Sequence, residues 1–109
     1  MATLYQLQTT MATLRSATIE IALTWRAGDS IILLGSTVAF VDWLNAYLND
    51  ADIEDIKAIY ALSDDIAALG ENTTAKLSLS AKLTAILTDA QWVKLTLNNE
   101  FDKVVTIAL

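Results

Sequence analysis

The clearest hydrophobic pattern lies in the middle of the chain. Residues 31–34 are four consecutive apolar residues, bounded by turn residues at 28–29 and 35–37. A short apolar run without alternation, flanked by turn signals, is typical of a strand buried on both faces of a parallel sheet. The pattern therefore predicts a fully buried strand over residues 30–34.

A helix is predicted directly after this strand. Apolar side chains recur at helical spacing between residues 37 and 48, and two parallel strands need a crossover connection that is usually a helix. We expect the apolar stripe of this helix, Trp43 included, to pack on the sheet as core and not to form a ligand cage. The stripe consists of Phe40, Trp43, Leu44, Tyr47 and Leu48.

A strand and a helix are also predicted ahead of the buried strand. Residues 3–8 alternate between polar and apolar, with Leu4 inward and Leu7 as a second candidate. A helix is expected over residues 11–26, with Thr9 and Thr10 as candidate caps. Its main apolar stripe consists of Leu14, Ala17, Ile21 and Trp25.

This first helix is apolar on more than one side. Ile19 and Leu23 lie four residues apart, away from the main stripe. A helix that is apolar on two sides is usually covered by more than the sheet. The cover would come from a neighbouring subunit or from a long C-terminal segment.

Three further strands complete the predicted sheet, over residues 56–62, 82–87 and 104–109. Residues 77–80 alternate as well, and they form either an edge strand or a loop laid over the core. The last strand is almost wholly apolar. We therefore expect it to be inserted in the sheet or paired across an interface.

Capping residues mark two more helices. Ser63 is the expected cap of a short helix that ends at Gly70. Thr88 and Gln91 have the spacing of a capping box, in which each side chain satisfies an unpaired backbone donor, and residues 98–99 close the helix that they begin. We expect this helix to carry Trp92, Leu95 and Thr96 on one side and Val93 and Leu97 beside them.

These elements predict one α/β domain over residues 1–109, with helices on both faces of a mostly parallel sheet. Composition adds the expectation of an interface. The chain is 54% hydrophobic with a mean hydropathy of +0.43, which is more apolar material than one small core is expected to hide. The alternative is a chain rich in Ala and Leu that is simply well packed.

The chain is expected to be cytoplasmic. Its longest apolar run is far shorter than the roughly 18 residues of a membrane span, and its first residues have no signal-peptide layout. The net charge is −6, and the seven basic residues are spread thinly. We therefore expect neither a membrane nor a direct nucleic-acid partner.

The sequence contains no Cys, no His and no Pro. Disulfides, thiol chemistry and the usual zinc and imidazole sites are therefore excluded within this chain. No catalytic, cofactor-binding or metal-binding residue is assigned from the sequence.

Two groups of acidic residues are candidate sites. Four carboxylates between residues 50 and 55 suggest either a divalent cation or a solvated loop, and the loop is favoured because the spacing fits no calcium signature. Asp64 and Asp65 follow a predicted strand, where α/β proteins place their sites. They are either an acid/base or metal pair or first-turn residues that complement the helix dipole, and the second interpretation is favoured.

Four segments in order suggest a family. They are TLY at residues 3–5, GDSIILL at 28–34, YALSDDIAALG at 60–70 and LTDAQWVKLT at 87–96. With these segments the chain resembles, over essentially its whole length, the DsrH/TusB family of the DsrE/DsrF/DsrH-like sulfur-relay proteins.

The resemblance implies a three-layer α/β/α sandwich with a five-stranded, largely parallel sheet. It also implies a subunit of a cytoplasmic hetero-oligomer of three related chains, which pass persulfide sulfur between cysteines. One kind of complex feeds 2-thiolation of the wobble uridine in tRNA, and another serves sulfur oxidation. The expected partners are DsrE/DsrF-like (TusC/TusD-like) chains that carry the active cysteine; alone, the chain would form a homodimer.

The chain departs from the family pattern at four places. Ile21 lies near the position where some sulfur-oxidation members carry a cysteine, which the tRNA-thiolation branch commonly lacks. Residues 36–37 (Ser-Thr) replace a frequent acidic-Gly pair, Tyr5 replaces a frequent His, and Ala68 replaces a frequent Arg. These changes leave the expected fold intact.

Three functions are considered on these observations. A thiolate is the nucleophile and carrier in persulfide transfer, so a chain without Cys is expected to be a non-catalytic subunit of the relay. The alternative is a diverged homo-oligomeric α/β binding or structural protein with no role in sulfur transfer. An enzyme that uses Ser or Asp chemistry is disfavoured, because the chain has no G-x-S-x-G elbow and no suitable base near any serine.

Overall fold

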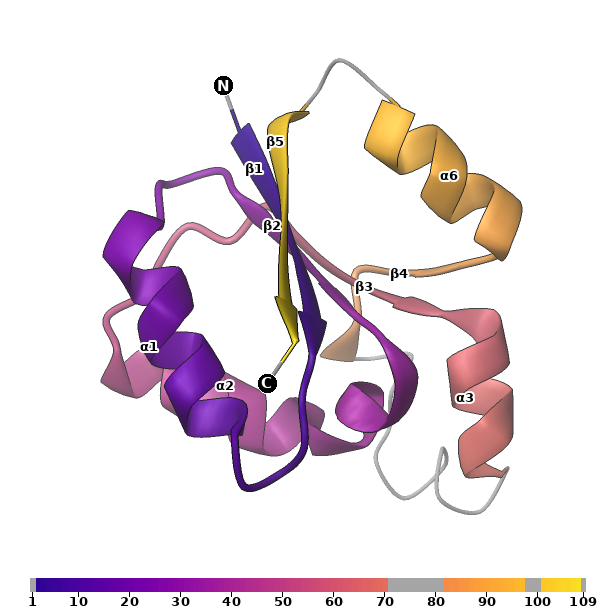
Figure 1. Cartoon of the computed structure of the whole chain (residues 1–109), viewed down its shortest axis with the longest axis horizontal. Helices are drawn as coiled ribbons and strands as arrows, with labels where there is room; N and C mark the ends of the chain where they lie inside the picture. The colour runs from indigo at the N-terminus through magenta and orange to yellow at the C-terminus, as the bar shows by residue number, and fades with distance from the viewer. Residues whose placement is uncertain (1, 71–81, 98–100, 109) are drawn as a thin grey trace.

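The computed structural model describes residues 2–70, 82–97 and 101–108, which form a five-stranded sheet (Figure 1). All neighbouring strands are parallel, in the order β4-β3-β2-β1-β5. The α/β class and the five-stranded sheet expected from the sequence are confirmed. The strands are β1 (Ala2–Gln8), β2 (Ser30–Leu33), β3 (Ala58–Leu62), β4 (Ala85–Leu87) and β5 (Phe101–Ala108).

Helices lie on both faces of this sheet. Figure 1 shows α1 and α2 on one side and α6 on the other, which makes three layers, and α3 packs through Ile66 and Leu69 against the core that α1 and α2 cover. The helices are α1 (Leu14–Thr24), α2 (Val41–Asp50), α3 (Ser63–Leu69) and α6 (Asp89–Leu97), and a 3₁₀ helix, η1 (Gly35–Phe40), leads into α2. Within the described ranges, no helix combines the length and apolar character that a membrane crossing requires.

The central strand β2 is buried at all four residues, as predicted. Because side chains alternate across a strand, Ile31 and Leu33 enter one core and Ile32 enters another. The first core packs β1, β2 and β3 against α1 and α2. The second core consists of Leu4, Ile32, Leu62 and Phe101, with Trp92 and Leu95 of α6 packed against it.

The last strand lies at the edge of the sheet. β5 pairs with β1 from Ala2↔Phe101 to Gln8↔Ala108, with one irregularity between Ala2 and Thr3. The insertion of this strand in the sheet is confirmed, although the strand begins at Phe101 and not at residue 104. Residue 109 lies outside the described residues.

The first helix is shorter than predicted, because local hydrogen bonds delay its start. The N–H of Thr10 donates to the hydroxyl of Thr13 at 3.1 Å, and the N–H of Thr13 donates to the hydroxyl of Thr10 at 3.3 Å. This closed turn precedes the helix, whose N-cap is Thr13 with no side-chain cap bond. The prediction of Thr9 or Thr10 as the cap is therefore wrong. Thr9 instead bonds through its N–H to the hydroxyl of Thr37.

Two strands also begin later than predicted. Thr84 accepts a hydrogen bond from the Ile59 N–H through its hydroxyl at 3.0 Å, and its own N–H donates to the Ile59 carbonyl at 2.8 Å. These two bonds replace the regular backbone ladder between the strands just before β4 begins.

The predicted cap of α3 is wrong by one residue. Ser63 is the first residue of α3, and Leu62 is its N-cap. The expectations for residues 77–80 and 98–99 lie outside the described residues.

The prediction that Trp43 is a core residue is wrong. Trp43 is 57% exposed, whereas its neighbour Leu44 is fully buried. Val41, Leu44 and Leu48 are the buried positions of α2, and Phe40 and Tyr47 are partly buried against the same core, as predicted. Trp43 lies about 100° from Leu44 around a helix of 3.6 residues per turn. The preceding helix η1 determines which side of α2 faces the sheet, because Val38 of η1 and Val41 of α2 both enter the first core. The Trp43 ring packs on Tyr47 instead, with centroids 6.3 Å apart.

The capping box at the start of α6 is confirmed. The Thr88 N–H donates to Oε1 of Gln91 at 2.9 Å, and the Gln91 N–H donates to the Thr88 hydroxyl at 3.2 Å. Both bonds satisfy donors that the helix itself leaves unpaired.

Substituting Leu44 and Trp43 separately tests the phase of α2. We expect Leu44→Ala to lower the free energy of unfolding by about 2–5 kcal/mol, because it empties space in the core. Trp43→Ala should cost less than about 1 kcal/mol, since it removes only a surface ring contact. Urea unfolding curves of the two variants measure the difference, and equal losses would contradict the orientation of this helix.

Thr88→Ala tests the capping box. Loss of a threonine cap is expected to lower the free energy of unfolding by about 0.5–2 kcal/mol. Thr96→Ala in the same helix is the matched control, because the Thr96 hydroxyl donates to the Val93 carbonyl within the helix and caps neither end. Thermal unfolding of both variants should show a lower Tm for Thr88→Ala alone.

Candidate functional site

The two acids after β3 have different surroundings. Oδ2 of Asp65 accepts a hydrogen bond from the N–H of Gly35 at 2.9 Å, while Asp64 is exposed. Gly35 is the first residue of η1, and its φ of +60° favours glycine. Asp65 lies in the first turn of α3, as the favoured interpretation requires, but the backbone N–H that it caps belongs to η1 and not to α3.

The acidic connection between α2 and β3 is a surface loop with structural bonds. Asp52 and Asp55 have φ values of 57° and 56°, a conformation that aspartate adopts more readily than most residues. The carbonyls of Glu54 and Asp55 accept hydrogen bonds from Nε1 of Trp25 and from the N–H of Gly28. In the part of the chain that the structure describes, no three His, Cys, Asp or Glu side chains come together as a metal site.

The positions singled out by the family resemblance are dispersed. Ile21 is buried in the first core under α1, and Tyr5 is buried on β1. Thr37 is buried in η1, where its hydroxyl accepts from Thr9, and Ala68 is exposed on α3. Tyr5 and Ile21 thus belong to the same buried core, while Thr37 and Ala68 lie on η1 and α3.

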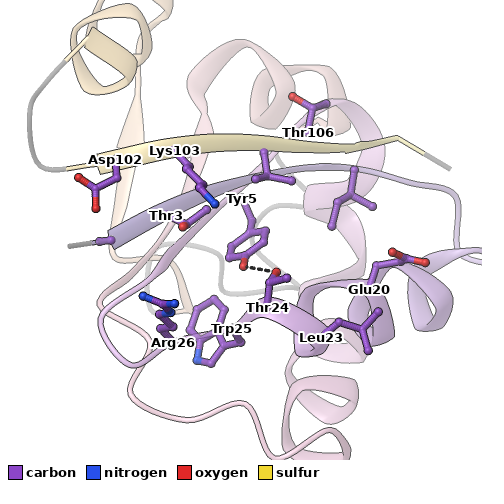
Figure 2. Close-up of a pocket in the computed structure, with 13 residues that line it drawn as sticks. Thr3, Tyr5, Glu20, Leu23, Thr24, Trp25, Arg26, Asp102, Lys103 and Thr106 are labelled. Atoms are coloured by element: carbon purple, nitrogen blue, oxygen red, sulfur yellow. Dashed lines mark hydrogen bonds between the residues drawn. The ribbon is translucent and has the colours of Figure 1, made fainter.

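The sequence did not reveal a groove of about 710 Å³ between α1 and β5 (Figure 2). Its floor is determined by the strand register, because Thr3 pairs with Lys103 and Tyr5 pairs with Val105 on the same face. β5 is an edge strand, and side chains of α1 form the opposite wall of the groove. The groove is the strip of sheet face that remains beside the helix.

The inner wall of the groove is fixed by two aromatic rings. Tyr5 stacks on Trp25 with centroids 5.7 Å apart, and its hydroxyl bonds to that of Thr24 at 2.8 Å. Trp25 is held from outside by its bond to the Glu54 carbonyl. Both rings thus join the end of α1 to β1 at a defined distance.

A buried carboxylate holds the end of the groove near the start of β1. Asp29 accepts hydrogen bonds from the N–H of Thr3 at 2.8 Å and from the N–H of Arg26 at 2.9 Å. Charge-assisted bonds of this kind are strong and directional. They fix the backbone turn after α1 and leave the Arg26 side chain on the surface.

Charged side chains occupy the rim of the groove. Figure 2 shows Arg26, Lys103 and Asp102 at the end where β1 begins and Glu20 near the other end. Between them lie Leu23 on the helix and Val105 and Ile107 on the floor. An apolar middle with charges at its ends suits binding of a partner surface, with the ends fixing its direction.

One signal in the sequence pointed toward this groove. Ile19 and Leu23 form the second apolar side of the first helix, and they are 54% and 75% exposed. Leu23 lines the groove. The floor could not be found, because it depends on the pairing of β1 with a strand about a hundred residues away.

No family model matches this chain, and no curated protein matches it either.

Asp65→Ala tests the bond between α3 and η1. We expect it to lower the free energy of unfolding by about 0.5–2 kcal/mol, because the Gly35 N–H loses its acceptor. Asp64→Ala is the matched control, since it removes a first-turn charge from the same helix without that bond. Asp65→Asn, which keeps an acceptor oxygen, should retain more stability than Asp65→Ala in urea unfolding.

Proposed function

We propose that this chain is a non-catalytic subunit of a cytoplasmic sulfur-relay complex, the role implied by its resemblance to the DsrH/TusB family. Its partners are DsrE/DsrF-like (TusC/TusD-like) chains whose cysteines carry the persulfide. The complex would serve either tRNA wobble-uridine 2-thiolation or sulfur oxidation.

The observation that carries this proposal is exposed apolar surface on both helical layers. Leu23 and Trp43 are exposed on α1 and α2, and Val93 and Leu97 are exposed on α6. Large apolar side chains that gather on a surface mark protein interfaces. A subunit with such residues on two faces is suited to contact more than one neighbour.

The chemistry of the chain supports a role in assembly. Persulfide transfer needs a thiolate as nucleophile and carrier, and the sequence contains no Cys. The sulfur would therefore pass along the partner chains while this chain holds them in position. The all-parallel sheet with helices on both faces agrees with the fold that the resemblance implies.

A second candidate is a diverged homo-oligomeric binding protein with no role in sulfur transfer. The groove between α1 and β5 favours it, because about 710 Å³ lies within the usual size of ligand sites. Binding to the cysteine-bearing chains discriminates the two candidates.

Reconstitution with the DsrE/DsrF-like chains of the same cell tests the relay role. We expect the tagged protein to retain these chains on purification. After incubation with a cysteine desulfurase and labelled cysteine, mass spectrometry should find the sulfur on the partner's cysteine and none on this chain. A partner in which that cysteine is replaced by serine is the control, which should still bind but carry no label.

Two results would refute the relay role. One is failure of the cysteine-bearing chains to bind the protein at micromolar concentration. The other is a stable sulfur adduct on this chain itself.

A further inference from the structure

We propose that the groove between α1 and β5 is the docking surface for a second copy of this chain, and that each copy lays its α1 in the groove of the other. The two helices would run antiparallel about a two-fold axis that passes close to Leu23.

The shape of this face is self-complementary. Leu23 is 75% exposed on α1, and the groove beside it has Val105 and Ile107 on its floor, whereas Ile19 lines a separate hollow toward α2. Ridge and hollow are thus neighbours on one surface. A two-fold rotation places each ridge over the other copy's hollow, which is the requirement for an isologous contact.

The groove also lacks the cover that a parallel sheet normally has. Both faces of such sheets are usually covered by helices, and on this face a groove remains between α1 and β5. Val105 and Ile107 are partly buried against the first core but open on their outer side to the groove. In parallel sheets this part of the face is usually covered by a helix, and α1 of a second copy would supply that helix here.

The charges select an antiparallel arrangement. Glu20 and Leu23 lie on α1, Arg26 lies two residues past the end of this helix, and all three line the groove. Their charge pattern is negative, apolar, positive, so an axis at Leu23 brings Glu20 of each copy to Arg26 of the other. A parallel arrangement would place like charges together, which is unfavourable.

Both charged groups are available for such contacts. Among the described residues the structure records no ion pair for Glu20 or Arg26, and both are exposed. Arg26 is held through its backbone N–H by Asp29, which leaves its guanidinium available. Lys103 lies at the same end of the groove (Figure 2) and adds a second cation for the partner's Glu20.

Leu23→Glu tests the contact at the proposed axis. Sedimentation velocity of the full chain at micromolar concentration should show a dimer for the unaltered protein. Leu23→Glu places two carboxylates at the axis and should raise the dissociation constant about tenfold or more. Leu97→Glu is the matched control, because Leu97 is 77% exposed but lies on α6 in the opposite layer, and it should remain dimeric.

Charge reversal tests the direction of packing. Glu20→Arg and Arg26→Glu should each weaken the dimer, because both ion pairs become like-charge contacts. The double variant restores opposite charges across the axis, so its dissociation constant should return to within about threefold of the original. Circular dichroism checks that each variant is folded, and the double variant decides the question if Leu23→Glu is not.

Three outcomes would overturn the inference. They are a monomeric unaltered protein, dissociation by Leu97→Glu but not by Leu23→Glu, and a double charge variant as weak as the single ones. This result is separate from the relay role, because self-association and binding to the cysteine-bearing chains are measured in different mixtures.

Discussion

Burial of β2 is the constraint on which the rest of the structure depends. All four of its residues are inaccessible, and it lies between β1 and β3 at the centre of the sheet. A strand in this position must be covered on both faces, and parallel neighbours can be reached only through crossover connections. The two cores, the two helical layers and the order of the strands all meet this requirement. The groove at the surface, by contrast, depends on how much of the sheet face α1 leaves uncovered beside β5.

Local and periodic features of the fold could be predicted from the sequence. The apolar run at β2, the Leu14-Ala17-Ile21 stripe of α1 and the Thr88–Gln91 box depend on residues close together in the chain, and the structure has all three. Trp43 was misplaced because two apolar columns compete on one helix, and the choice between them is made by η1. A 3₁₀ helix has three residues per turn and shifts the phase of the α-helix that continues from it.

The groove could be predicted only in part. One wall was visible as the second apolar side of α1, but the floor requires the register between β1 and β5, which joins opposite ends of the described chain. The acids after β3 could be assigned to capping by their position, but not to the N–H of Gly35, because that contact arises from the packing of α3 beside η1. Long-range pairing was therefore the information that the local patterns did not contain.

The position of β5 also has a consequence for synthesis on the ribosome. Among the described strands, β1 is made before its two neighbours in the sheet, and β2 emerges within a few tens of residues of it. Its neighbour on the other side is the last described element to appear. Until then the outer edge of β1 exposes unpaired backbone groups beside buried-type side chains, a template for pairing with other chains. During synthesis this edge of β1 is therefore open to misassociation until β5 emerges and pairs with it, after which β5 forms the edge of the sheet.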